Sequence, residues 1–117
     1  MPTPAELTTG TVKERHRDRF QKIVTETTTA RTVSEDDIDA FIVCSNAGAV
    51  TLTIPESTST AGKKLPIGTV IRAFAKGAGG ITWAKTGSDT LTGTATAAQN
   101  IARGVIKVAA TEWVAFV

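Results

Sequence analysis

Residues 40–55 read AFIVCSNAGAVTLTIP, and this stretch decides the fold class. Its apolar residues recur at every second position on either side of a short polar segment: Phe41 and Val43 before it, and Val50, Leu52 and Ile54 after it. A period of two is what a half-buried β-strand requires. Asn46–Gly48 between the two runs tolerates positive φ, so the chain can reverse there. The pattern predicts two strands joined as a β-hairpin.

The same pattern continues toward the C-terminus at intervals of about ten residues, which is typical of antiparallel all-β domains. Gly77–Gly80 is interpreted as a second hairpin turn. The fold class that we expect is mainly β, an antiparallel β-sandwich or small barrel. Five of the six aromatic residues fall in expected strands and are assigned to the core or to a seam between subunits: Phe41, Phe74, Trp83, Trp113 and Phe116.

The first 24 residues differ from the rest of the chain. Residues 1–10 contain two prolines and no apolar period, which predicts an extended arm. Thr11–Glu14 fits a capping box at the start of a short amphipathic helix. We therefore expect an arm and helix over residues 1–24 and a single antiparallel β-domain over residues 25–117.

Length and composition limit the chain to an ordinary globular class. It has 117 residues, of which 41% are hydrophobic and 21% are charged, enough for one domain with one core. No apolar run approaches the roughly 18 residues of a membrane span, and the N-terminus lacks a signal-peptide pattern. We expect synthesis in the cytoplasm and no membrane contact. Cys44 is the one cysteine, and we expect it to be a small buried hydrophobe.

No set of residues in the sequence predicts catalysis, a metal site or a cofactor. His16 is the only histidine and has no partner for acid–base work. Residues 77–80 lack the Lys-Ser/Thr pair of a phosphate loop. The acidic run lacks the spacing of a calcium loop and is interpreted as a solvated turn: Glu35, Asp36, Asp37 and Asp39. We expect a non-enzymatic protein.

The expected helix presents both charged and apolar side chains. Its cations are interleaved with acidic residues at helical spacing, and Phe20 is the one aromatic residue nearby, so a protein contact is favoured over nucleic acid. We assign partner binding to this segment through apolar and electrostatic anchors. The apolar anchors are Val12, Phe20 and Ile23, and the electrostatic anchors are Arg15, Arg17 and Arg19.

The chain from about residue 38 to residue 117 resembles a β-module of tailed-bacteriophage virion proteins. The matching stretches are residues 46–55 (NAGAVTLTIP), 65–71 (LPIGTVI), 81–83 (ITW), 87–93 (GSDTLTG) and 111–115 (TEWVA). The resemblance implies a trimeric virion component, most simply a capsid decoration protein that binds the major capsid protein or another virion protein. A tail-fibre or adaptor component, with a receptor- or saccharide-binding role, is the alternative. We also expect a homotrimer because Trp83, Trp113 and Phe116 would be exposed in a monomer.

Overall fold

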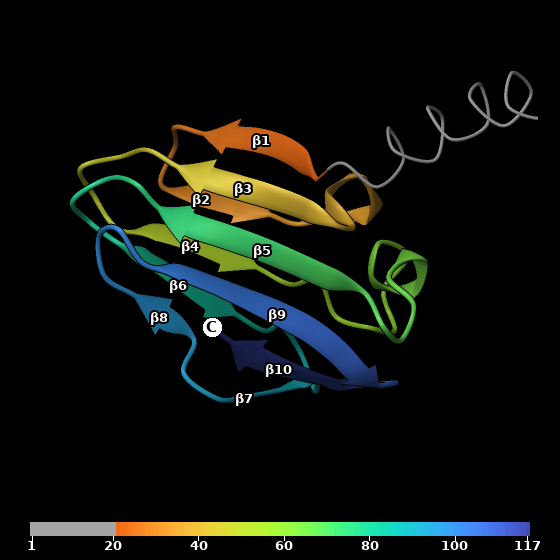
Figure 1. Cartoon of the computed structure of the whole chain (residues 1–117). Helices are drawn as coiled ribbons and strands as arrows, with labels where there is room; N and C mark the ends of the chain where they lie inside the picture. Colours follow the sequence, from red (N-terminus) through yellow and green to blue (C-terminus); the bar gives the residue numbers. More distant parts are fainter. Residues whose placement is uncertain (1–20) are drawn as a thin grey trace, which may run out of the picture.

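Two β-sheets pack face to face in the computed structural model, which describes residues 21–117 (Figure 1). The six-stranded sheet has the order β1-β3-β5-β9-β10-β7, and the four-stranded sheet has the order β2-β4-β6-β8. The prediction of a mainly β fold is confirmed. The strands are β1 (Lys22–Glu26), β2 (Ala30–Thr32), β3 (Ala40–Cys44), β4 (Val50–Thr53), β5 (Val70–Ala75), β6 (Ile81–Ala84), β7 (Thr90–Thr92), β8 (Thr96–Ala97), β9 (Ala102–Ala109) and β10 (Glu112–Phe116).

Consecutive strands alternate between the two sheets along the first part of the chain. β1, β3 and β5 pair in parallel in one sheet, and β2, β4 and β6 pair in parallel in the other. Each pair β1–β2, β3–β4 and β5–β6 is thus one coil, and the coils stack as in a β-helix. The C-terminal strands close this arrangement differently: β8 and β9 run antiparallel to β6 and β5, and β9–β10 is a hairpin.

The prediction of a β-hairpin over residues 40–55 is wrong. β3 and β4 lie in different sheets, and residues 45–49, which are exposed or half-buried, carry the chain from one sheet to the other at the end of the sandwich. The backbone amides of Val50 and Thr51 donate to Gly80 and Thr29, not to β3. Residues 76–80 likewise link β5 to β6 across the sandwich. A period of two reports which residues face a core, and it does not report which strand supplies the hydrogen bonds.

The inward face of β3 also differs from the expected one. Ala40, Ile42 and Cys44 are buried, while Phe41 and Val43 lie on the outer face of the six-stranded sheet. Every residue of this strand is apolar, so alternation could not decide which face is covered. The expectation that Cys44 is buried is confirmed, and burial raises the pKa of its thiol to about 11.

The core between the sheets is built around two tryptophans. Trp83 on β6 and Trp113 on β10 are 2% and 0% exposed, so the expectation that they are exposed in a monomer is wrong. Trp83 Nε1 donates to the carbonyl oxygen of Arg103 at 3.0 Å, which joins the two sheets through the core. Smaller side chains from both sheets fill the remaining space: Val33, Ile42, Leu52, Ile54, Ile71, Ile81 and Val105.

The loops that connect the sheets stack on one another at the same end of the sandwich. Asn46 Nδ2 donates to the carbonyl oxygen of Thr27 at 2.7 Å, which ties the second loop to the first. Gly77 and Gly79 of the third loop lie so close to the backbone at Asn46 and Gly48 that neither position has room for a Cβ atom. Close approach of loop backbones is therefore the reason for glycine here.

Replacing Gly79 by alanine tests this stacking. We expect Gly79→Ala to lower the free energy of unfolding by about 2–3 kcal/mol, since the new methyl group overlaps the Gly48 backbone. Ala78→Ser is the control, because Ala78 is exposed in the same loop and should change the value by less than about 0.5 kcal/mol. Urea unfolding followed by circular dichroism gives both values. Equal stability of the two variants would contradict the stacking argument.

A buried ion pair anchors the segment between β2 and β3. Asp37 is 1% exposed and ends a 3-10 helix, Glu35–Asp37. Its carboxylate accepts hydrogen bonds from Arg31 Nη2 at 2.6 Å and from Arg31 Nε at 3.3 Å. It accepts a third from the Ser34 backbone amide at 3.2 Å. Expecting a solvated turn was therefore wrong for Asp37, because the guanidinium and the helix cap replace water around this carboxylate.

Arg31 also joins Asp37 to the end of β1. Its Nη1 lies 3.0 Å from Glu26 Oε1, and Glu26 in turn accepts the Thr28 hydroxyl at 2.6 Å. The Asp37 carboxylate raises the pKa of Arg31, and the Thr28 hydroxyl is the main cause that lowers the pKa of Glu26. The guanidinium is thus held between β1 and the Glu35–Asp37 turn.

Removing Asp37 from its ion pair with Arg31 should lower the stability of the domain. We expect Asp37→Ala to lower the free energy of unfolding by about 2–4 kcal/mol, because the partly buried Arg31 loses its closest partner. Asp36→Ala is the matched control, since Asp36 is an exposed neighbour of the same type and should have an effect below about 0.5 kcal/mol. Chemical denaturation at neutral pH measures both, and a small effect for Asp37→Ala would show that the pair is dispensable.

The structure places three residues of the expected arm and helix in a strand. Lys22, Ile23 and Val24 lie in β1, and Gln21 precedes it. Residues 1–20 of the expected arm and helix lie outside the described part of the chain. Within residues 21–117, no helix has the length and apolar character needed to cross a membrane.

Candidate functional site

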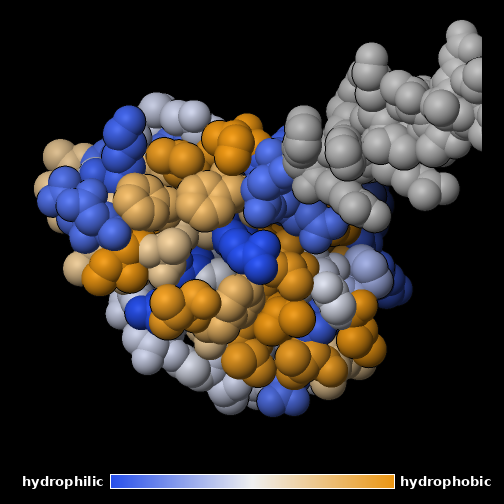
Figure 2. All heavy atoms as spheres, in the orientation of Figure 1, coloured by the Kyte–Doolittle hydropathy of each residue, from blue (hydrophilic) through white to orange (hydrophobic). Residues whose placement is uncertain are grey.

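The outer face of the six-stranded sheet carries mainly apolar side chains. Figure 2 shows them gathered over β3, β5, β9 and β10, with hydrophilic residues among them and around the edge. We call this surface the apolar face. Its members are Phe41 and Val43 on β3, Val70, Arg72 and Phe74 on β5, Ile106 on β9, and Val114 and Phe116 on β10.

Strand register arranges these residues in rows across the sheet. In the middle row, Phe41 lies beside Arg72, Arg72 beside Gly104, and Gly104 beside Phe116. A second row runs along Val43, Phe74 and Ala102, and a third along Val70, Ile106 and Val114. Residues in register share one face, so the rows form one continuous surface over four adjacent strands.

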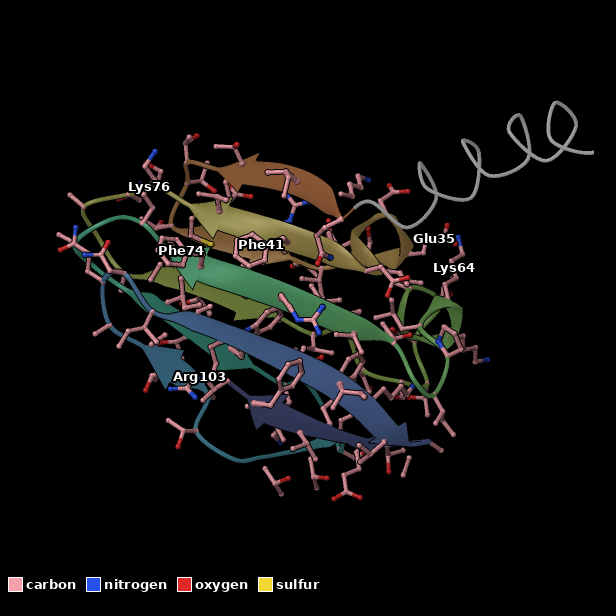
Figure 3. The ribbon with its side chains drawn as sticks, in the orientation of Figure 1. Glu35, Phe41, Lys64, Phe74, Lys76 and Arg103 are labelled. Carbon is pink, nitrogen blue, oxygen red and sulfur yellow. The ribbon has the colours of Figure 1, made fainter. Side chains whose placement is uncertain are left out.

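Two aromatic contacts shape the middle of the apolar face. The rings of Phe41 and Phe74 stack with centroids 6.4 Å apart and planes at 24°, and Figure 3 shows them side by side on β3 and β5. The guanidinium carbon of Arg72 lies 5.7 Å from the centroid of the Phe116 ring, within cation–π range. The one charged side chain in these three rows of the described chain is therefore already stacked on a ring.

Gly104 allows Phe116 to occupy this position. A Cβ atom at residue 104 would lie 2.7 Å from Cζ of Phe116, closer than carbon atoms pack. The ring thus covers the β9 backbone where no side chain projects. Gly104 and the small Ala102 keep this part of the face low, and the Phe116 ring lies over Gly104.

The size and chemistry of the apolar face suit contact with another protein surface. Strands β3, β5, β9 and β10, about 4.8 Å apart and about six residues long, outline roughly 400 Å² before side-chain relief is counted. The largest apolar patch on a typical monomer covers about 300–600 Å² and is often functional. Apart from Arg72, the three rows carry no polar side chain among residues 21–117.

The outer face of the four-stranded sheet has a different chemistry. Thr51, Thr82 and Thr96 form one row across β4, β6 and β8, and Thr53 lies beside Ala84 in the next. Threonine suits an exposed strand because its hydroxyl group remains hydrated. The two outer faces thus differ sharply in polarity.

Two buried charged side chains, Lys107 and Asp89, have separate partners inside the domain. Lys107 is 6% exposed, donates to the Leu65 carbonyl oxygen at 2.8 Å and lies 5.9 Å from the Trp113 ring centroid. Asp89 is 1% exposed and accepts the amide and hydroxyl of Ser57 at 3.0 and 2.7 Å. Asp89 Oδ1 and Trp113 Nε1 have no hydrogen-bond partner among the described residues. The contacts of Lys107 and Asp89 tie loops 55–69 and 85–90 to the rest of the domain.

The sequence-based partner-binding residues fall almost entirely outside the described chain. Val12, Arg15, Arg17, Arg19 and Phe20 belong to residues 1–20, so their assignment stays a prediction. Ile23 lies in β1, is 62% exposed and pairs in register with Phe41. It therefore extends the apolar face to the edge strand.

In the sequence alone, Phe41 and Phe74 stay open between the core and a seam between subunits, and Arg72 is not singled out, although a signal for this face is present. Both faces of β3 and β5 are apolar in sequence, while one covered face requires apolar residues at alternate positions only. Residues 21–117 contain no group of three or more His, Cys, Asp or Glu side chains placed to hold a metal ion. His16 lies outside this range.

Comparison of the chain with protein-family models, with curated proteins and with solved structures finds no significant match. The class that the fold and the site define is therefore a two-sheet β-domain with one exposed apolar face.

Gly104→Ala tests the geometry of the apolar face. We expect the added methyl group to displace the Phe116 ring from β9 and to end its contact with Arg72. In proton NMR spectra the Arg72 side-chain signals should lose their ring-current shift. Thr82→Ala on the opposite outer face is the control and should leave these signals in place. Unchanged Arg72 shifts in Gly104→Ala would show that the ring does not depend on this glycine.

Proposed function

We propose that this chain is a non-enzymatic structural protein of a tailed-bacteriophage virion, which acts through protein–protein contacts as a capsid decoration protein. The observation that carries the proposal is the apolar face, since a broad exposed apolar surface is typical of proteins that assemble with others. The resemblance of residues 46–55, 81–83 and 87–93 to the phage module adds the virion context.

The acidic residues of the described chain support a structural role. Asp37 is occupied by Arg31, Asp89 by Ser57, and Glu56 by Ser88. The Ser88 backbone amide is the main cause that lowers the pKa of Glu56, which favours its role as an acceptor. General acid catalysis at neutral pH needs a carboxyl group with a raised pKa, which the lowered pKa of Glu56 does not supply. The contacts of the three carboxylates fix loops.

In this proposal, residues 1–24 attach the protein to the capsid and the two-sheet domain projects from it. The apolar anchors of the attachment segment are Val12, Phe20 and Ile23, and its cations are Arg15, Arg17 and Arg19. Many copies on a lattice would multiply a weak contact through avidity. The protein needs no cofactor for this role.

Immunogold electron microscopy tests the location. Antibodies raised against residues 21–117 should label the capsids of intact particles, and mass spectrometry should find the chain in purified virions. Label confined to tails would move the protein to the fibre or adaptor class. Its absence from purified particles would overturn the virion proposal. A pre-immune serum on the same particles is the control.

A further inference from the structure

We propose that the apolar face and the attachment segment, residues 1–24, contact one partner surface together, and that this surface combines apolar side chains with a carboxylate group that meets Arg72. The inference rests on the proposed function, in which residues 1–24 bind a virion protein. It adds a second contact on the two-sheet domain and states the chemistry of the partner.

The attachment segment and the apolar face meet at β1. Ile23, an anchor of that segment, is 62% exposed and lies in register beside Phe41. Gln21 Nε2 donates to the carbonyl oxygen of Asp39, whose backbone amide donates to the Val70 carbonyl oxygen at 2.9 Å. The part of the segment outside the described chain therefore joins the domain level with the row that contains Val70. A partner bound by the segment is brought next to this row.

Two further exposed apolar side chains lie at this end of the sheet. Val108 on β9 is 44% exposed, and Ile67 in the turn before β5 is 62% exposed. The Gly68 backbone amide donates to the Lys107 carbonyl oxygen at 2.7 Å, which holds this turn against β9. Exposed apolar residues thus continue beyond the three rows at the end of the sheet where the attachment segment joins.

The area of the apolar face is about half of what a standard interface needs. Its four strands outline roughly 400 Å², whereas a standard stable interface buries roughly 800 Å² per partner. Contact through the face alone would be weak, and contact through the attachment segment alone leaves the face uncovered. When both bind one partner, the second contact forms within the complex, and its high effective concentration raises the affinity.

The charges on the two parts have the same sign. Arg72 is exposed, and no carboxylate of the described chain lies within 4.0 Å of it. The attachment segment adds Arg15, Arg17 and Arg19. A guanidinium stacked on a ring still donates through the edge of its plane, so Arg72 can pair with a carboxylate while it stays on Phe116. A partner surface with carboxylates complements both parts, whereas a second copy would bring Arg72 against Arg72.

Binding of the full-length protein to purified capsids that lack it tests the inference, with the bound fraction measured by co-sedimentation over a range of protein concentrations. Arg72→Glu should weaken binding by roughly 30-fold, because it places a carboxylate against that of the partner, and Phe74→Ser should weaken it by roughly 10-fold. Thr82→Glu is the matched control, since it places glutamate mid-strand on the opposite outer face and should leave the affinity unchanged. Circular dichroism verifies the fold of each variant.

The outcomes separate this inference from the proposed function. Equal affinities of the wild type, Arg72→Glu and Phe74→Ser would overturn the inference and leave the capsid role intact. No binding by the wild type would overturn both.

Two other occupants of the apolar face would also overturn the inference. A wild-type oligomer that Phe74→Ser dissociates, in sedimentation of the free protein, would show that a second copy covers the face. Faster tryptic cleavage at Arg15, Arg17 and Arg19 in free Phe74→Ser than in the free wild type would show that residues 1–20 cover it.

Discussion

Parallel pairing of every second strand is the constraint on which the rest of the structure depends. It requires each strand to be followed by a chain segment that passes to the other sheet, and it stacks the segments after β1, β3 and β5 on one another at one end of the sandwich. The close approach of loop backbones there is the reason for glycine at positions 77 and 79. The hydrogen bond from Asn46 to Thr27 joins the first two loops. Repetition of one coil therefore determines both the strand order in the sheets and the need for small residues in the stacked loops.

The same constraint explains why polar residues occur where a simple sandwich would not need them. The long segments between coils must be fixed without strands of their own. Arg31 holds the segment before β3 through Asp37, while Lys107 and Asp89 hold the loops around β5 and β6 through Leu65 and Ser57. Buried charges stabilise only when nearly every contact is made, which holds for Asp37 with Arg31 and Ser34, whereas Asp89 Oδ1 has no hydrogen-bond partner among the described residues. These side-chain contacts hold the segments that run between the sheets.

The sequence predicts the fold class but not the strand pairing. Alternation at Val50, Leu52 and Ile54 identifies a strand and its buried face correctly, because threonines mark the other face. At β3 both faces are apolar, so neither its inward face nor its partner strand follows from the pattern. The asparagine and glycines of residues 46–48 and 77–80 predict a reversal, and a reversal between sheets uses the same residues as a hairpin. Long-range hydrogen bonds such as that of Thr51 with Thr29 leave no local signal.

The ambiguity of β3 and the candidate site have one physical origin. A strand that is apolar on both faces belongs in the middle of a layered structure, and the isolated chain supplies a layer on one side only. Polar residues in place of Phe41, Phe74 and Phe116 would have given these strands a simple alternation of apolar and polar positions. The outer face of the six-stranded sheet would then be hydrated, like the threonine rows on the opposite sheet. The departure from simple alternation is thus itself informative: it marks the strand whose outward side chains, Phe41 and Val43, belong to the apolar face.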